Sequence, residues 1–158
     1  MNANQALLLA AMKVVTVQNL PECTAQEVFD FVALNLLAQN RQSLAFCAET
    51  GGDVCVYRGN EGTKCAAGFI FNDEEAKVCE GKGWTYLAAA SQSGESEMYG
   101  LTKIPADHAN LISALQLIHD RSEPVEWPDR LRRLTKTQFV GPVPLNTINL
   151  DAFLNAAD

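Results

Sequence analysis

The residues best suited to chemistry in this sequence are its five cysteines and two histidines, and a thiol nucleophile is the first possibility. Such a nucleophile needs a base within reach and a lowered pKa. The candidates are Cys65, which follows Lys64, and His108 or His119 as the base. We expect Cys65 to lie in a strand, where Lys64 would face the opposite side of the sheet. This favours a packed cysteine, so we assign no catalytic residue.

A metal site is the next chemistry that cysteine and histidine allow. Structural zinc sites usually contain close ligand pairs such as C-x-x-C, but the closest cysteines here, Cys47 and Cys55, are eight residues apart. His108 and His119 would lie about 16 Å apart on one helix and cannot share a metal. A site that combines His119 with two distant cysteines stays open as an alternative, and we assign no metal ligand. Phosphate-binding glycine motifs are also missing from the sequence, so no cofactor is expected.

Acidic side chains gather in the segment NDEEAKVCEGKG, which begins at Asn72. Carboxylates at this density could coordinate a hard cation or serve in acid–base chemistry. Their spacing does not match a calcium-binding loop, and the glycines favour an exposed acidic loop over residues 72–83. Because such a loop is suited to contact a partner, we expect three of its residues to bind one: Asp73, Glu74 and Glu75.

The net charge limits the classes of partner. The chain has 12 Lys and Arg against 19 Asp and Glu, which gives a net charge of −7. Because a sequence-independent grip on nucleic acid needs clustered cations, nucleic acid is not expected as a partner. The segment RLRRLTK is locally basic, so the molecule is electrostatically asymmetric. We add four cations to the expected partner-binding surface: Arg58, Lys64, Arg132 and Arg133.

Apolar periodicity predicts the helices that must position these residues. Thr24 and Glu27 form a capping box at the start of the clearest helix. Asp107 is expected to cap another helix, and Pro128 suits the first turn of the last one. The four predicted helices cover residues 4–14, 25–39, 107–120 and 128–137.

Short runs rich in Val, Phe, Tyr and Cys predict the strands. They are LAFCAE, DVCVYRG and TKCAAGFIF, which lie between residues 44 and 71. We predict a hairpin that turns at Asn60 and Glu61, because flanking glycines allow a tight turn. The fold class is therefore α+β, with a small antiparallel sheet and central hairpin packed with about four helices. One domain is expected over residues 1–140, with 141–158 as a C-terminal extension or short helix.

The N-terminal segment MNANQALLLAAMKVV bears on localisation. No cation precedes its apolar run, and the run is far shorter than the roughly 20 residues that span a bilayer. We therefore expect neither a signal peptide nor a membrane partner. An odd number of cysteines favours free thiols over a disulfide framework. Together these features predict a cytoplasmic protein.

Several stretches resemble a group of small, uncharacterised proteins of bacteriophages and prophages. The group has the motif Y-R-x-x-x-G-x-K-C-A-x-G, found here at Tyr57 to Gly68, and then D-E, found at Asp73-Glu74. A leucine-rich helix ending in H-D follows at Leu111 to Asp120, and W-x-x-x-L at Trp127 to Leu131. Asn35 stands where the first helix of the group has histidine. The resemblance implies a phage origin, hence the host cytoplasm, and a shared fold, but no activity.

We therefore expect a phage-encoded accessory protein that binds a host protein and could inhibit a host defence or regulatory factor. The first alternative is a small enzyme or ligand-binding protein that uses Cys65 with His119, or Glu80 with Lys82. The second alternative is a minor virion or assembly component that forms homo-oligomers through its N-terminal helix. Charge asymmetry and the lack of a convergent catalytic set favour the binding of a host protein.

Overall fold

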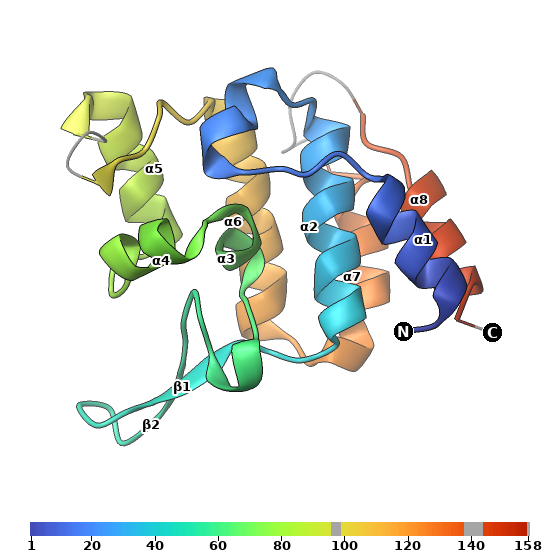
Figure 1. The fold of residues 1–158 in the computed structure, drawn as a ribbon, viewed down its shortest axis with the longest axis horizontal. Helices are drawn as coiled ribbons and strands as arrows, with labels where there is room; N and C mark the ends of the chain where they lie inside the picture. Colours follow the sequence, from blue (N-terminus) through green and yellow to red (C-terminus); the bar gives the residue numbers. More distant parts are fainter. Residues whose placement is uncertain (96–98, 138–143, 158) are drawn as a thin grey trace.

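Helices form most of the computed structural model, which describes residues 1–95, 99–137 and 144–157 (Figure 1). One two-stranded antiparallel sheet accompanies them, so the α+β prediction is confirmed. Short 3₁₀ helices lie at Val17–Glu22, Asn60–Gly62 and Pro124–Glu126. The main elements are α1 (Ala3–Ala11), α2 (Ala25–Gln39), β1 (Leu44–Cys47), β2 (Gly52–Cys55), α3 (Ala66–Ile70), α4 (Asp73–Cys79), α5 (Trp84–Ser93), α6 (Ala106–Arg121), α7 (Trp127–Leu134) and α8 (Ile148–Asn155).

The two longest of these helices, α2 and α6, pack side by side and form the centre of the core (Figure 1). The predicted capping box starts α2, because Thr24 accepts the Glu27 N–H and the Glu27 carboxylate accepts the Thr24 N–H. A left-handed residue, Asn40, ends it. The apolar stripe of α6 is buried as its periodicity predicts, for example at Leu111 and Leu115.

The last helix, α8, closes the core from the side of α2 opposite to the hairpin. Leu150 and Phe153 are buried, and α8 packs against both α1 and α2 (Figure 1). Two polar contacts fix it: Gln5 Nε2 donates to the Phe153 carbonyl at 3.2 Å, and Asn149 Nδ2 donates to Asp30 Oδ2 at 2.7 Å. The two ends of the chain therefore lie near each other. The domain boundary expected at residue 140 lies outside the described residues.

The predicted helices occur as α1, α2, α6 and α7, with small shifts at their ends. Pro105 rather than Asp107 is the N-cap of α6, so the predicted cap is wrong and Asp107 lies in the first turn. Pro128 occupies the first turn of α7, as predicted. In the described part of the chain, no helix is both long and apolar enough to cross a bilayer.

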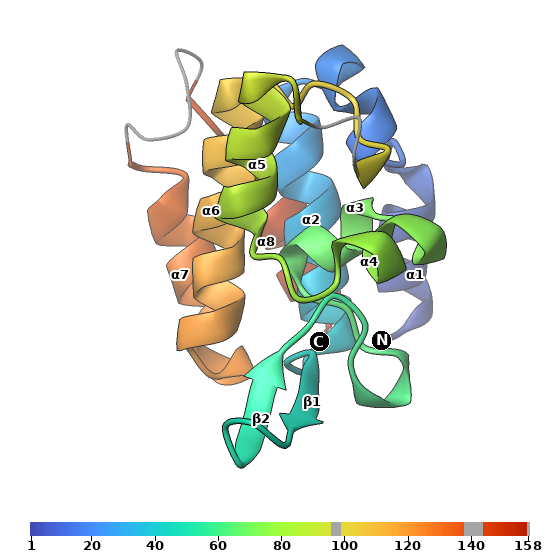
Figure 2. The same ribbon diagram turned by 90° about the vertical axis from the view of Figure 1, so that its left-hand side faces the viewer.

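The hairpin is formed by β1 and β2, and it projects from the helical body (Figures 1 and 2). Leu44 pairs with Cys55, and the chain reverses over residues 48–51, where the φ of 69° at Gly51 suits glycine. The hairpin turn predicted at Asn60 and Glu61 is therefore wrong. Those residues instead belong to a 3₁₀ turn in the loop that returns the chain to the helical body.

The run TKCAAGFIF, predicted as a strand, contains helix α3. Cys65 is its N-cap, with Sγ accepting the Gly68 N–H at 3.4 Å. The run lacks the alternation of a half-buried strand because this helix is buried almost all round. Gly68 permits the packing, since a Cβ there would lie 2.4 Å from the Tyr57 carbonyl oxygen. Arg58 holds the other end, donating to the carbonyls of Gly68 and Phe71 at 2.7 Å each.

The segment predicted as an acidic loop is mostly helix α4. Asn72 caps it, accepting the Glu75 N–H while the Glu75 carboxylate accepts the Asn72 N–H. Acidic side chains in the first turn suit the positive end of the helix dipole. Ala76 and Cys79 bury the inner face, which is why the segment folds as helix despite the glycines that follow it.

Candidate functional site

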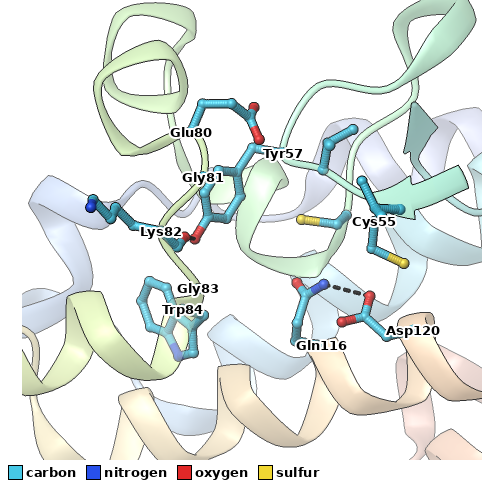
Figure 3. A pocket seen from close by; sticks show the side chains of 12 residues that line it. Cys55, Tyr57, Glu80, Gly81, Lys82, Gly83, Trp84, Gln116 and Asp120 are labelled. Atoms are coloured by element: carbon cyan, nitrogen blue, oxygen red, sulfur yellow. Dashed lines mark hydrogen bonds between the residues drawn. The ribbon is translucent and has the colours of Figure 1, made fainter. Parts of the chain in front are cut away.

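A pocket of about 280 Å³ lies where the hairpin, the segment between α4 and α5, and helix α6 meet (Figure 3). Its walls combine charged, aromatic and thiol side chains from parts of the sequence that are far apart. A second hollow of about 270 Å³ shares Trp84, Gln116 and Asp120 with it and extends along α6 to Leu117. The first pocket is lined by residues 54–57 and 80–84 together with Cys65, Gln116 and Asp120.

Asp120, in the last turns of α6, carries a negative charge into this pocket. Its Oδ1 accepts hydrogen bonds from Gln116 Nε2 at 2.7 Å and from His119 Nδ1 at 2.8 Å. Burial tends to raise the pKa of the Asp120 carboxyl, but hydrogen bonds from His119 and Cys55 outweigh burial and leave this pKa below its usual value. Asp120 is therefore ionised at neutral pH.

His119 is fully buried and has a defined tautomer. The Ser43 backbone N–H donates to Nε2 at 2.8 Å, so Nε2 is the acceptor and the ring proton is on Nδ1, facing Asp120. The ring lies 5.7 Å from the Trp127 ring, centroid to centroid. With both nitrogens engaged, His119 orients Asp120 and anchors the start of the hairpin, and it has no lone pair to offer a thiol as a base.

The same tautomer decides whether a metal fits. One ligand atom each from Cys55, His119 and Asp120 lie within 4.8 Å of one another. A metal ligand on His119 Nδ1 would need the proton to move to Nε2, where it would meet the Ser43 N–H. The donor set of this cluster therefore does not fit a metal ion.

The thiols around the pocket are poor nucleophiles. Cys65 is buried, and this burial raises the pKa of its thiol to about 12 although it caps α3. The expectation that Cys65 lies in a strand was wrong, but its position as the N-cap of α3 does not activate the thiol. Cys55 belongs to the exposed strand β2, with its sulfur beside Asp120 (Figure 3). Desolvation and the neighbouring carboxylate raise the pKa of Cys55 as well.

Aromatic residues form the opposite wall of the pocket, and their polar atoms are already paired. The Tyr57 hydroxyl donates to the Lys82 carbonyl at 2.5 Å, and Trp84 Nε1 donates to the Ala109 carbonyl at 3.0 Å. The Lys82 ammonium points away from Asp120 and lies 5.7 Å from the centre of the Tyr86 ring (Figure 3). The wall that remains for a ligand is mainly aromatic ring surface.

The residues that the sequence singled out for partner binding do not meet at one place. Arg58 is held by α3 and pairs with Asp73 at 2.9 Å, so both belong to the support of α3 and α4. Glu75 caps α4 and accepts from Gln18 Nε2 at 2.9 Å. Glu74 is exposed beside them.

The cationic residues of that set are equally dispersed. The backbone of Lys64 exchanges two hydrogen bonds with the Gln39 side chain. Arg132 pairs with Asp151 at 2.9 Å and so joins α7 to α8, whereas Arg133 is exposed. Most of these charges therefore stabilise the fold, and they lie outside the pocket lining.

Sequence inspection missed the residues that define the pocket, namely Asp120, Gln116 and Cys55. The only local signal was the pair His119-Asp120 near the end of a predicted helix. Gln116 gives no signal by itself, yet it accepts the Ala67 N–H at 3.1 Å and donates to Asp120, thus linking α3 to the pocket. Glu80 and Lys82, the second pair of the enzyme alternative, do line the pocket.

Comparisons with known proteins add no relative. No model of a known protein family matches the chain, and searches of curated proteins and of solved structures also found no match.

Proposed function

We propose that this chain is a phage-encoded accessory protein that binds a host protein through the face made by the hairpin and the pocket. We call this surface the hairpin–pocket face and define it by five residues: Phe46, Cys55, Trp84, Leu117 and Asp120. The sequence resemblance supports the phage setting, and the arrangement of exposed apolar side chains around the pocket supports protein binding.

The position of Phe46 carries the proposal. Phe46 pairs with Asp53 and Leu44 pairs with Cys55, so the strand register places Phe46 and Cys55 on the same side of the hairpin. The Phe46 side chain is 69% exposed on a hairpin that projects from the body (Figure 2). An exposed aromatic residue on the same side of the hairpin as a pocket-lining residue is suited to anchor a protein interface.

The neighbouring surface extends the apolar area beyond the pocket. Leu117 is 59% exposed and lines the second hollow, which shares Trp84 and Asp120 with the first pocket. Sites for free small molecules usually enclose most of the ligand surface. A shallow pocket of about 280 Å³ flanked by exposed Phe and Leu is better suited to one side chain of a larger partner.

The test is affinity capture of the tagged chain from bacterial lysate, with mass spectrometry of the retained proteins. We expect Phe46→Ser to lose a specific partner that the unmodified chain retains. The matched control is Ile148→Ser, which removes an equally exposed apolar side chain from α8 at a distance from the hairpin (Figure 1). The proposal would be contradicted if both variants retained the same partner equally well. It would also be contradicted if neither the variants nor the unmodified chain retained a specific partner.

A further inference from the structure

We infer that the pocket beside Asp120 receives a cationic side chain of the partner, with arginine as the preferred residue. This inference rests on the proposed function, because it names the chemistry of the partner at the centre of the hairpin–pocket face. Three observations carry it: the free side of an ionised carboxylate, the position of the nearest lysine, and the aromatic wall.

The first observation concerns the two oxygens of Asp120. Both side-chain hydrogen bonds from nitrogen, those of Gln116 and His119, go to Oδ1. Within the described parts of the chain, no nitrogen or oxygen donor reaches Oδ2. The Cys55 sulfur lies on the side of Oδ1, the oxygen that accepts from Gln116 (Figure 3), and a thiol is a weak donor. A partly solvated, ionised oxygen at the wall of a pocket is suited to a charge-assisted hydrogen bond from a cation.

The second observation is that the chain does not use its own lysine to neutralise the pocket. Three charged residues line the pocket, Glu80, Lys82 and Asp120. Lys82 directs its ammonium away from Asp120 toward Tyr86, so its charge does not occupy the space in front of the carboxylate (Figure 3). Arg121 lines only the second hollow. With Glu80 at the rim, the space inside the pocket therefore favours a positive group and disfavours an anion.

The third observation distinguishes a guanidinium from other cations. Tyr57 and Trp84 present ring surface to the pocket, and each has its polar atom bonded to a backbone carbonyl. A planar guanidinium can lie against an aromatic ring while it donates to a carboxylate, and its weak hydration lowers the cost of entry. A lysine ammonium would reach the same oxygen but would gain less from the rings.

The experiment titrates the whole protein with small probes and follows amide signals by NMR. The probes are N-acetyl-arginine methylamide and its neutral isostere N-acetyl-citrulline methylamide. We expect the arginine probe to shift the signals of Cys55, Gly83 and the Gln116 side chain in a saturable way, and to bind at least about tenfold more tightly than the citrulline probe. In Asp120→Asn, which keeps an oxygen that can accept from Gln116 and His119, the two probes should bind alike.

A second variant guards against a local change of structure in Asp120→Asn. Glu80→Gln alters an exposed rim residue that takes no part in the Asp120 hydrogen bonds, and it should weaken the arginine probe about twofold to threefold. Equal binding of both probes to the unmodified chain, or no shift of pocket signals by either, would overturn the inference. If the probes fail to discriminate but Phe46→Ser loses a specific partner, the proposed function stands and only the cationic ligand is refuted. If the probes discriminate but Phe46→Ser keeps every partner, the pocket binds a guanidinium and the proposed function is refuted.

Discussion

Two aspartates of this molecule are similarly placed in helices but differ in their surroundings. Asp30, in α2, is 6% exposed and accepts from two neutral amides, Gln26 Nε2 at 2.9 Å and Asn149 Nδ2 at 2.7 Å. Burial outweighs these bonds and raises the pKa of the Asp30 carboxyl. At Asp120, hydrogen bonds from His119 and Cys55 outweigh burial and lower the pKa.

The comparison shows that the number of hydrogen bonds alone does not decide the charge of a buried carboxyl. Asp30 joins α8 to α2 through its hydrogen bond with Asn149. A negative charge adds little to this contact, and burial destabilises the charged form of the carboxyl. Asp120 is ionised beside an open pocket, where its charge can act on a ligand. These surroundings give Asp30 a structural role and support the binding role that we propose for Asp120.

The largest effect on stability is expected from a change in α3, the helix that Gln116 links to the Asp120 pocket. Gly68→Ala would place a methyl group 2.4 Å from the Tyr57 carbonyl oxygen, and relief of this clash would require the backbone itself to move. We expect the free energy of unfolding to fall by about 3 kcal/mol in urea denaturation. Gly52→Ala is the control, because a Cβ there meets no atom within 4 Å, and it should change stability by about 0.5 kcal/mol or less. Equal losses for both glycines would contradict the packing of α3 described above.

The next prediction sets Asp120→Asn directly against Asp30→Asn. At pH 7, Asp120→Asn should cost about 1–2 kcal/mol of unfolding free energy, because charge-assisted hydrogen bonds are lost. A lowered folded pKa gives stability above the unfolded pKa of about 3.9 that disappears as pH falls through the folded value. The cost of Asp120→Asn should therefore vanish in acid.

Asp30→Asn should behave in the opposite way. A raised folded pKa gives stability below about pH 3.9 that is lost as pH rises through the folded value. The variant should therefore be neutral or up to about 1 kcal/mol more stable than the unmodified chain at pH 7, and lose that advantage in acid. Urea titrations from pH 3 to pH 8 measure both profiles. Parallel profiles for the two variants would remove the distinction between the carboxyls.

A smaller effect is expected on thiol reactivity, which should differ between the tip of the hairpin and the pocket. Hydrogen bonds from Thr50 lower the pKa of Cys47, which lies partly exposed near the hairpin turn, whereas the pKa of Cys55 and Cys65 is raised. We expect iodoacetamide at pH 8 to modify Cys47 at least about tenfold faster than Cys65, as read by mass spectrometry of peptides. Rapid modification of Cys65 would revive the enzyme alternative.

The smallest effect is expected at the ion pair that joins α7 to α8, on the side of Asp30. Arg132 and Asp151 are each about 40% exposed in their side chains, so Arg132→Ala should cost about 0.5 kcal/mol of unfolding free energy. Arg133→Ala, on the same helix and exposed, should cost less. A loss above about 2 kcal/mol at Arg132 would mean that α8 depends on this pair rather than on Phe153 and Asn149.

Local signals in the sequence predicted the long helices well and the short ones poorly. The capping box at Thr24 and the apolar stripe of α6 act within one helix, so both could be recognised without tertiary contacts. Helix α3 depends on Gly68 packing against Tyr57, a contact that no local pattern encodes. Its apolar run, without a helical or strand period, was therefore predicted as a strand.

The candidate site was harder to predict, because its parts come together only in three dimensions. Cys55 and Asp120 are brought together when Ser43 donates to His119 and places the start of the hairpin on α6. The density of acidic residues in α4 predicted a partner-binding surface. Asp73 and Glu75 instead form an ion pair and a capping hydrogen bond that support the fold. Asp120 is a single charge, but it lies at a pocket and is held by Gln116 and His119, and no local pattern in the sequence shows these contacts.

The most direct test of the binding face is site-specific photocross-linking in bacterial cells. A benzoylphenylalanine placed at Phe46, and separately at Ile148, would report which exposed apolar position contacts a partner. We expect irradiation to give a specific cross-linked partner from position 46 and none from position 148. A partner linked from position 148 alone, or from neither position, would contradict the assignment of binding to the hairpin–pocket face.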